Sequence, residues 1–434
     1  MKRRFFFGSL LAVLLLTDTI GASIYLHAER SADDRDTAFA NLQLYADVLE
    51  KVRKEYVDGK DITYHDLVYS SLKGMIGSLD PHSDFMDVDN YKELQDDTQG
   101  QFGGLGLVVA LSSNYVTVSV PMEDSPASRA GIVSGDRIVK INGKSAVNVA
   151  LPDVVKQLRG EPGTQVTITV ARPSTGRQRD ITLTRAIIKM GMVKDFDGRK
   201  QFPLGPDKIG YIRITQFGEN TGDELQGALD QLKGQGMKAL ILDLRWNPGG
   251  LLDQAVEVCQ KFLPRGQLVV STEGRESVER YVADGRGDEI PGIPVVVLVN
   301  GSSASAAEIV TGCLQDLHRA IILGVKTFGK GSVQTIFPLD DGSALKLTVA
   351  KYYTPSHKVI HEHGITPNIY VPMSDVDEAD LILRSSPGGP ESVDDKTRER
   401  VLHATDDQLE RARELLQGIL LYTARAGGTK VAAQ

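Results

Sequence analysis

The most constraining feature of this sequence is an alternation of apolar runs and amphipathic segments in its second half. Strand-like apolar runs occur at 210–214, 239–244, 294–299 and 321–325, and helical patterns at 222–232, 251–262 and about 305–314. Apolar strands separated by helices are typical of a sheet that helices cover. We therefore expect a layered α/β domain, followed by a hairpin over 332–339 and 344–352 that turns at Asp341-Gly342.

Other patterns precede and follow this domain. Helical periodicity predicts helices at 41–56 and 62–76. From Gly100 to about Arg185, short alternating strands, glycines and one amphipathic helix at 149–158 indicate a small β-rich module. The residues after 374 are polar and predict one amphipathic helix at 407–422.

With 434 residues, the chain is too long for one compact core. We expect a leader at 1–30, a helical region at 31–97, the β-rich module at 98–186, the α/β domain at 187–373 and a helical tail at 374–434.

The N-terminus indicates export. Lys2, Arg3 and Arg4 precede an apolar run at 5–16, which is short for a membrane span and suits a signal peptide. Cleavage within 21–28 and an uncleaved anchor with its positive end inside both fit this pattern. We expect a periplasmic protein of the bacterial cell envelope, either free or anchored to the inner membrane.

Composition narrows the classes of ligand. A net charge of -8 leaves no basic excess for a nucleic-acid partner. Cys259 and Cys313 cannot form a disulfide framework, and two buried free thiols are favoured over one bridge. Three histidines near residue 360 lack a carboxylate motif, so we expect no metal site and no cofactor.

Three short segments carry chemistry. In the first, residues 300–308 lead through small side chains into a helix that starts near Ser305. The helix dipole favours a nucleophile there, and the amide of Ala306 can face an oxyanion. Taken alone, the pattern is more typical of a serine helix cap.

The second segment, residues 329–334, enters a strand, which places Lys330 and Gln334 on one face. A lysine acts as a base only when it is neutral, and burial lowers its pKa. The amide oxygen of Gln334 can hold the lysine without adding charge. The third segment, residues 243–250, is a strand-to-helix turn that exposes backbone amides to an anion.

Together these segments resemble the carboxyl-terminal processing (tail-specific) proteases, peptidase family S41. The family's motifs appear as Ser303-Ala304-Ser305-Ala306-Ala307-Glu308, as Gly329 to Gln334 and as Asp243 to Gly250. Lys330 follows Ser305 at the spacing these enzymes use. The closing Gly-Ile-x-Pro-Asp is present from Gly364, with Asn368 in place of the usual aspartate. The resemblance covers roughly residues 40–373.

The resemblance implies a protease core of the crotonase/Clp-protease-like layered type with a helical N-terminal region. It implies that Ser305 is the nucleophile, Lys330 its general base and Gln334 the residue that orients the lysine. The amide of Ala306 and one amide of the Gly249-Gly250 turn, with Gly249 favoured, would stabilise the oxyanion.

The β-rich module resembles a PDZ domain that is inserted into the protease. Its carboxylate-binding loop matches Gly104-Leu105-Gly106-Leu107. Such a domain captures the C-terminus of a peptide by adding it as a strand. Arg159 resembles a family arginine that couples PDZ position to the active site, and we expect the module to gate activity.

We therefore predict a serine endopeptidase that cleaves exported proteins recognised through their C-terminal residues. Two other hypotheses stay open: a catalytically silent PDZ adaptor that binds protein C-termini, and a carrier of an apolar ligand on the same core. A lipoprotein-like adaptor and a second copy of the chain are further expected partners.

Overall fold

The structure is a computed structural model that describes residues 37–431 except 113, 123, 197, 285–288, 386–389, 391 and 392. The expected leader at 1–30 lies outside the described residues. The chain divides into two compact units, residues 1–87 and 88–434. No helix in the described part is long and apolar enough to cross a membrane.

The first unit is a short helical segment. Its elements are α2 (Ala38–Glu55), η2 (Gly59–Asp61), α3 (Tyr64–Gly77) and β1 (Asp84–Met86). Thr63 and Asp66 form a capping box that starts α3. The two helices predicted from periodicity are therefore present; their starts differ from the predicted ones by three and two residues and their ends by one.

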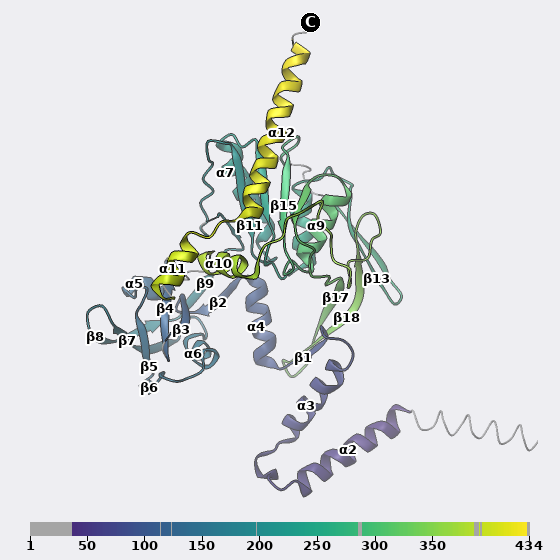
Figure 1. Ribbon diagram of the computed structural model, residues 1–434. Coiled ribbons are helices and arrows are strands. Elements are labelled where there is room, and N and C mark those ends of the chain that lie inside the picture. Colours follow the sequence, from purple (N-terminus) through teal and green to yellow (C-terminus); the bar gives the residue numbers. More distant parts are fainter. Residues whose placement is uncertain are drawn as a thin grey trace, which may run out of the picture. The chain divides into compact units, whose positions relative to one another are not determined.

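The β-rich module in the second unit is an antiparallel sheet with its own core (Figure 1). Its strands, in order across the sheet, are β3 (Leu107–Ser112), β4 (Tyr115–Pro121), β5 (Arg137–Ile141), β7 (Gln165–Arg172) and β8 (Arg177–Thr184), with β6 (Lys144–Ser145) beside β5. The helices are α5 (Pro126–Arg129) and α6 (Leu151–Leu158). The segments that enter and leave the module pair as β2 (Gln101–Gly104) and β9 (Ala186–Lys189), and α4 (Val88–Gln99) precedes them.

The second half contains the expected parallel sheet. Its strands, in order, are β10 (Val193–Lys194), β11 (Ile209–Ile214), β12 (Ala239–Asp243), β15 (Val295–Val299), β16 (Ile321–Gly324) and β19 (Ile369–Tyr370). All neighbours in this sheet are parallel except the edge pair of β10 and β11.

Helices cover both faces of this sheet, as a parallel sheet requires. The helices of one face are α7 (Thr221–Gly234), α8 (Leu252–Gln260) and α9 (Ala306–Asp316). Leu240 and Leu242 of β12 pack in the cluster that these helices form. Ile241 points to the opposite face and packs in the cluster that contains Leu416 of α12 (Asp407–Val431), the yellow helix in Figure 1.

A second, antiparallel sheet completes the second half of the chain. Its strands pair in the order β17 (Ser332–Pro338), β18 (Ala344–Tyr353), β13 (Leu268–Gly274) and β14 (Val278–Val282). The predicted hairpin is therefore confirmed as β17 and β18. The β13–β14 hairpin was not predicted from the sequence. Both cysteines, Cys259 and Cys313, are free and buried, as favoured above.

The C-terminal tail corrects a prediction. We expected one helix there, but α10 (Asp375–Ser385) and α11 (Asp395–Leu402) precede α12. Asp394 caps α11 by accepting from two amides of its first turn. Arg400 of α11 donates to both carboxylate oxygens of Asp380 in α10, at 2.7 and 2.8 Å. Polar contacts stabilise these two helices, so an apolar periodicity is a poor guide to them.

Candidate active site

Ser305 lies at the start of α9, directly after the turn that leaves the buried strand β15. Its backbone has φ +53° and ψ -116°, a region that non-glycine residues rarely adopt. Such strain persists only where the surroundings enforce it, and it is concentrated at functional sites. Ser305 is 7% exposed, so most of the residue is shielded from solvent.

Gly249 of the strand-to-helix turn lies against this serine. A Cβ at Gly249 would be 2.7 Å from the Ser305 Cβ and 3.0 Å from the Ala306 nitrogen. The φ of Gly249 is +101°, which also favours glycine. The turn therefore lies against the predicted nucleophile, as an oxyanion site formed from both would require.

The carboxylate of Glu308 connects the serine to the lysine segment. One oxygen, Oε2, accepts from the amides of Ser305 and Lys330, each at 2.9 Å. The other oxygen, Oε1, accepts from the Thr327 hydroxyl at 2.5 Å and the Gly329 amide at 2.7 Å. The amides of Ser305 and Lys330 are therefore close neighbours, although the residues lie far apart in the sequence.

Glu308 is fully buried, and burial raises the pKa of its carboxyl, while the bonds from Thr327 and Gly329 act in the opposite direction. All four of these partners donate to Glu308, which is the arrangement that an ionised carboxylate satisfies. Glu308 ends the Ser303–Glu308 motif, from which no role was predicted for it. Its position in the first turn of a helix, three residues after Ser305, was the available signal.

Lys330 is half-buried just before β17. Burial lowers the pKa of its amine, and the charge of Lys346 in β18 lowers it further. Within the described part of the chain, its Nζ has no hydrogen bond and no ion pair. No carboxylate in this part of the chain stabilises the protonated amine. At a given pH, a larger fraction of Lys330 is therefore neutral than of an exposed lysine.

Gln334 lies on β17, and its side chain has other partners in this structure. The amide nitrogen donates to the Ser332 hydroxyl at 2.8 Å and to Thr348 Oγ1 at 3.3 Å. Among the described residues, no hydrogen bond joins Gln334 to Lys330. The roles of Lys330 and Gln334 stay predictions.

The amides expected at the oxyanion site differ in their hydrogen bonding. The Gly249 amide donates to the side-chain oxygen of Asn247 at 2.8 Å. Among the described residues, the amides of Ala306 and Gly250 have no hydrogen-bond acceptor. Asn247 also accepts from the Ala304 amide through its backbone oxygen at 2.9 Å, which ties the turn to the nucleophile segment. In this conformation the unengaged donor of the turn is therefore Gly250.

The expected carboxylate-binding loop of the β-rich module lies where β2 ends and β3 begins. Gly104 is the last residue of β2, Leu105 is 2% exposed and Leu107 begins β3. The backbone oxygen of Gly106 accepts from the Met122 amide at 2.9 Å. The amides of Leu105 and Gly106 have no acceptor among the described residues. Within the module's own sheet, β3 pairs only with β4, which leaves its other edge for an added strand.

Arg159 ends α6 and contacts the segment that enters the module. Its guanidinium carbon is 4.7 Å from the centre of the Phe102 ring in β2, and its Nη1 is 3.6 Å from Glu93 of α4. These residues line a cavity of about 630 Å³ between α4, α6 and β2. In the part of the chain that the structure describes, no hydrogen bond, ion pair or ring contact joins Arg159 to the residues around Ser305.

Comparison with known proteins identifies the family. The model of peptidase family S41 matches residues 208–371, and that of the PDZ domain matches residues 117–172. A carboxy-terminal-processing protease of Bartonella bacilliformis is 39% identical over 423 residues, 93% of this chain and 95% of that protein. A probable CtpA-like serine protease of Staphylococcus epidermidis is 36% identical over 83% of this chain and 72% of that protein.

Among solved structures, a photosystem II D1 C-terminal processing protease is 31% identical, covers 79% of this chain and 92% of that one, and has a TM-score of 0.43. The resemblance seen in the sequence motifs is thus confirmed over nearly the whole chain by the Bartonella relative. The chain belongs to peptidase family S41, the carboxy-terminal-processing proteases, and is a serine-type peptidase with a PDZ domain.

Proposed function

We propose that this peptidase is an endopeptidase with a Ser305–Lys330 dyad, which cleaves exported proteins that it recognises through their C-terminal residues. The observation that carries the dyad is the Glu308 carboxylate, because a single oxygen accepts from the amides of both residues. By accepting from both amides, this buried carboxylate holds the backbones of Ser305 and Lys330 close together, as a catalytic dyad requires.

In the first half of the reaction, neutral Lys330 takes the hydroxyl proton as Ser305 Oγ attacks the scissile carbonyl carbon. The tetrahedral intermediate collapses, the peptide C–N bond breaks, and the lysine returns the proton to the leaving amine. A water molecule then attacks the acyl carbon and gives one proton to Lys330. The C–O bond to Ser305 breaks, the second product leaves with a new carboxyl group, and Lys330 returns the proton to Ser305 Oγ, which restores both residues. The lowered pKa of Lys330 supports its role as the base.

The developing negative charge on the carbonyl oxygen would be stabilised by two backbone amides. One is the Ala306 amide, which follows the nucleophile and has no acceptor among the described residues. The second comes from the Gly249-Gly250 turn. The engagement of the Gly249 amide with Asn247 favours Gly250 in this conformation, and a rotation that releases Asn247 would make Gly249 the donor.

We further propose that the PDZ domain binds the substrate's C-terminus. The amides of Leu105 and Gly106 would hold the terminal carboxylate, and the preceding residues would extend the sheet along the open edge of β3. Gating would act through Arg159 at the end of α6. Its contacts with Phe102 of β2 and Glu93 of α4 link the module to the segment that enters it.

The cellular part of the proposal rests on the N-terminal sequence. The cations at residues 2–4 and the apolar run at 5–16 support export to the periplasm, either free or anchored to the inner membrane. A lipoprotein-like adaptor and self-association remain part of the same proposal.

Two variants test the dyad. Ser305→Ala and Lys330→Ala should each abolish hydrolysis of an unstructured protein substrate while leaving binding of its C-terminal peptide intact. Equal turnover by wild type and Ser305→Ala would refute the enzyme mechanism and leave the silent adaptor. Full activity of Lys330→Ala would refute the dyad alone.

A matched pair of substrates tests PDZ recognition. The same protein substrate is prepared with a free C-terminal carboxylate and with a C-terminal amide, which removes only the charge. We expect the amidated substrate to bind less tightly and to be cleaved more slowly. Equal cleavage of the pair would refute recognition through the C-terminus. A nonhydrolysable peptide with a free C-terminus should change the rate of cleavage of a short substrate in wild type but not in Arg159→Ala.

A further inference from the structure

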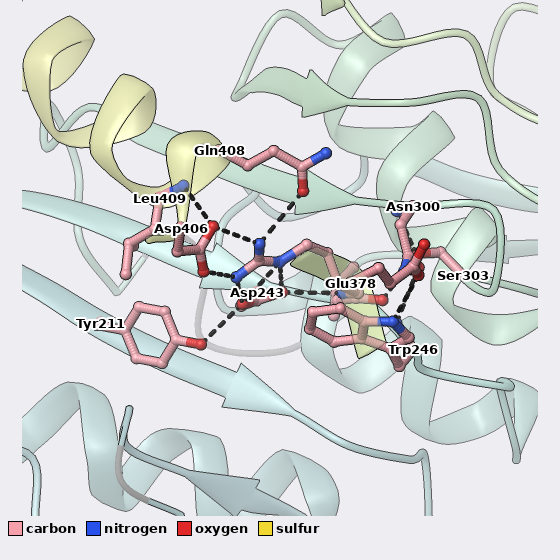
Figure 2. Close-up of polar contacts among 11 residues, drawn as sticks. Tyr211, Asp243, Trp246, Asn300, Ser303, Glu378, Asp406, Gln408 and Leu409 are labelled. Carbon is pink, nitrogen blue, oxygen red and sulfur yellow. Dashed lines mark hydrogen bonds and ion pairs between the residues drawn. The ribbon is translucent and has the colours of Figure 1, made fainter. Parts of the chain in front are cut away.

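The first helix of the C-terminal tail contacts both turns of the active site. Figure 2 shows Glu378 of α10 beside Trp246 and Asn300. Its Oε1 accepts from the indole nitrogen of Trp246 at 2.7 Å and from the side-chain nitrogen of Asn300 at 2.7 Å. Trp246 belongs to the oxyanion turn, residues 245–250, and Asn300 begins the nucleophile turn, residues 300–305. One oxygen of the tail thus bridges the two turns that lie on either side of the reacting carbonyl.

Further bonds strengthen this bridge. The side-chain oxygen of Asn300 accepts from the Trp246 amide at 2.9 Å and from the Ser302 amide at 3.2 Å. The Ser303 hydroxyl donates at 2.8 Å to the backbone oxygen of Leu244, the residue before the oxyanion turn. Because Glu378 binds the nitrogen of the Asn300 side chain, it fixes the direction in which the oxygen of that side chain points.

The backbone of Trp246 shows why such contacts are needed. Its φ is +57°, in the left-handed region that a bulky side chain avoids. Its ring lies near two guanidinium groups, with Arg213 at 5.2 Å and Arg245 at 5.0 Å from the ring centre. A strained residue keeps its conformation only when several contacts determine it, and Glu378 supplies one of them.

The tail has a second attachment one residue earlier in the turn. Arg245 donates to both oxygens of Asp406, at 2.8 and 2.7 Å, and also to Asp243 (Figure 2). Arg245 and Asp406 are 2% and 7% exposed. This buried ion pair places the tail against the oxyanion turn and so keeps Glu378 within reach of Trp246.

We propose that Glu378 is a positioning residue for the oxyanion hole: it holds the oxyanion turn and the nucleophile turn at the separation that lets one amide of the oxyanion turn and the Ala306 amide, directly after the nucleophile turn, bind the same oxygen. The inference rests on the proposed serine mechanism. Glu378 does not touch the substrate, and its effect passes through Trp246 and Asn300. Loss of the bridge should therefore weaken binding of the tetrahedral intermediate far more than binding of the substrate.

The first test compares three variants of the full chain on a peptide substrate. Glu378→Ala removes the acceptor, Glu378→Gln keeps an acceptor oxygen of the same reach, and Asp375→Ala removes an exposed carboxylate from the same helix as a control. We expect Glu378→Ala to lower kcat by about 10- to 100-fold, the range for a small misplacement of catalytic groups, with KM changed less than about twofold. Glu378→Gln should recover most of kcat, and Asp375→Ala should match wild type.

A peptidyl boronate gives a readout that general destabilisation would not produce. It forms a tetrahedral adduct with the nucleophile, so its inhibition constant should rise with the loss of kcat in Glu378→Ala, while the affinity for an uncleaved C-terminal peptide stays unchanged. A kcat of Glu378→Ala within twofold of wild type would overturn the proposal, as would an equal defect in Glu378→Gln. If wild type neither cleaves the peptide nor binds the boronate, the proposed mechanism fails instead.

A second variant guards against loss of the folded tail. Trp246→Phe removes the indole donor and keeps an aromatic ring, so it leaves α10 itself intact. It should lower kcat in the same direction as Glu378→Ala, and the double variant should be little worse than the more impaired single variant. Fully multiplicative losses in the double variant would show that the two residues act independently and would overturn the proposal.

Discussion

Replacing Asp406 with alanine leaves Arg245 with only one of its two carboxylate partners. Arg245 Nη1 and Nη2 each lose a charge-assisted hydrogen bond to Asp406, at 2.8 and 2.7 Å. Arg245 is only 2% exposed, so water does not replace these bonds freely. Hydrogen bonds to charged groups contribute about 1.5–3 kcal/mol each, and Arg245 keeps its bonds to Asp243, so the loss of these two bonds lowers the free energy of unfolding by about 3–5 kcal/mol. Asp406 also caps α12, because its Oδ1 accepts from the Leu409 amide at 3.0 Å, and loss of a cap adds about 1 kcal/mol.

The expected total of about 4–6 kcal/mol is large beside the net stability of a typical domain. We expect the loss to appear first as local opening of α12, because that helix covers one face of the parallel sheet. Hydrogen exchange of α12 and urea unfolding measure the effect, and a Ser305→Ala background prevents self-digestion during the measurement.

Asp407→Ala is the matched control, since it removes the adjacent, exposed carboxylate. It should change the unfolding free energy by less than about 1 kcal/mol, as surface substitutions generally do. A difference between the two variants below about 1 kcal/mol would refute the reasoning. It would mean that Asp243 alone satisfies Arg245 and that the tail is not anchored by this pair.

Three other predictions concern the base, the buried carboxylate and the PDZ loop. The kcat/KM should rise with pH as Lys330 loses its proton, and because burial and Lys346 lower the pKa of Lys330, the rise should occur below the titration range of an exposed lysine. Lys346→Gln should move this limb to higher pH and Lys351→Gln should not; an unmoved limb in Lys346→Gln would contradict the assignment. Glu308→Gln places an NH₂ donor opposite amides and a hydroxyl that already donate. The free energy of unfolding, measured by heat or urea, should fall by about 1–3 kcal/mol, and kcat should fall as well. Unchanged stability would disprove this account. Gly106→Ala should abolish binding of C-terminal peptides in a calorimetric titration, because φ is +71° and a Cβ would lie 2.2 Å from a neighbouring side chain; retained affinity would count against the loop assignment.

Local patterns in the sequence predicted most of the regular structure. The apolar runs became the parallel sheet, and the segment turned at Asp341-Gly342 became the hairpin of β17 and β18. These elements were accessible because strand and helix periods, glycines and caps act over a few residues. The motifs around Ser305, Lys330 and Gly249 identified the family for the same reason, since each is a short contiguous segment.

Elements without an apolar stripe were missed. The tail helices α10 and α11 and the entry helix α4 are polar, and α4 buries no residue. The short strands β13 and β14 also gave no clear signal. Their stability depends on partners elsewhere in the chain, such as β18 for β13, and periodicity within a segment does not report such partners.

The sequence by itself determined the family, the layered core and the residue types of the site. Only the tertiary structure decided how those residues are held. It brings three donors from residues 327–330 onto Glu308 of α9, and it joins Glu378 of the tail to Trp246 and Asn300. The physical reason is distance along the chain: hydrogen bonds between residues far apart in sequence depend on how the strands and helices pack, and no local pattern encodes them.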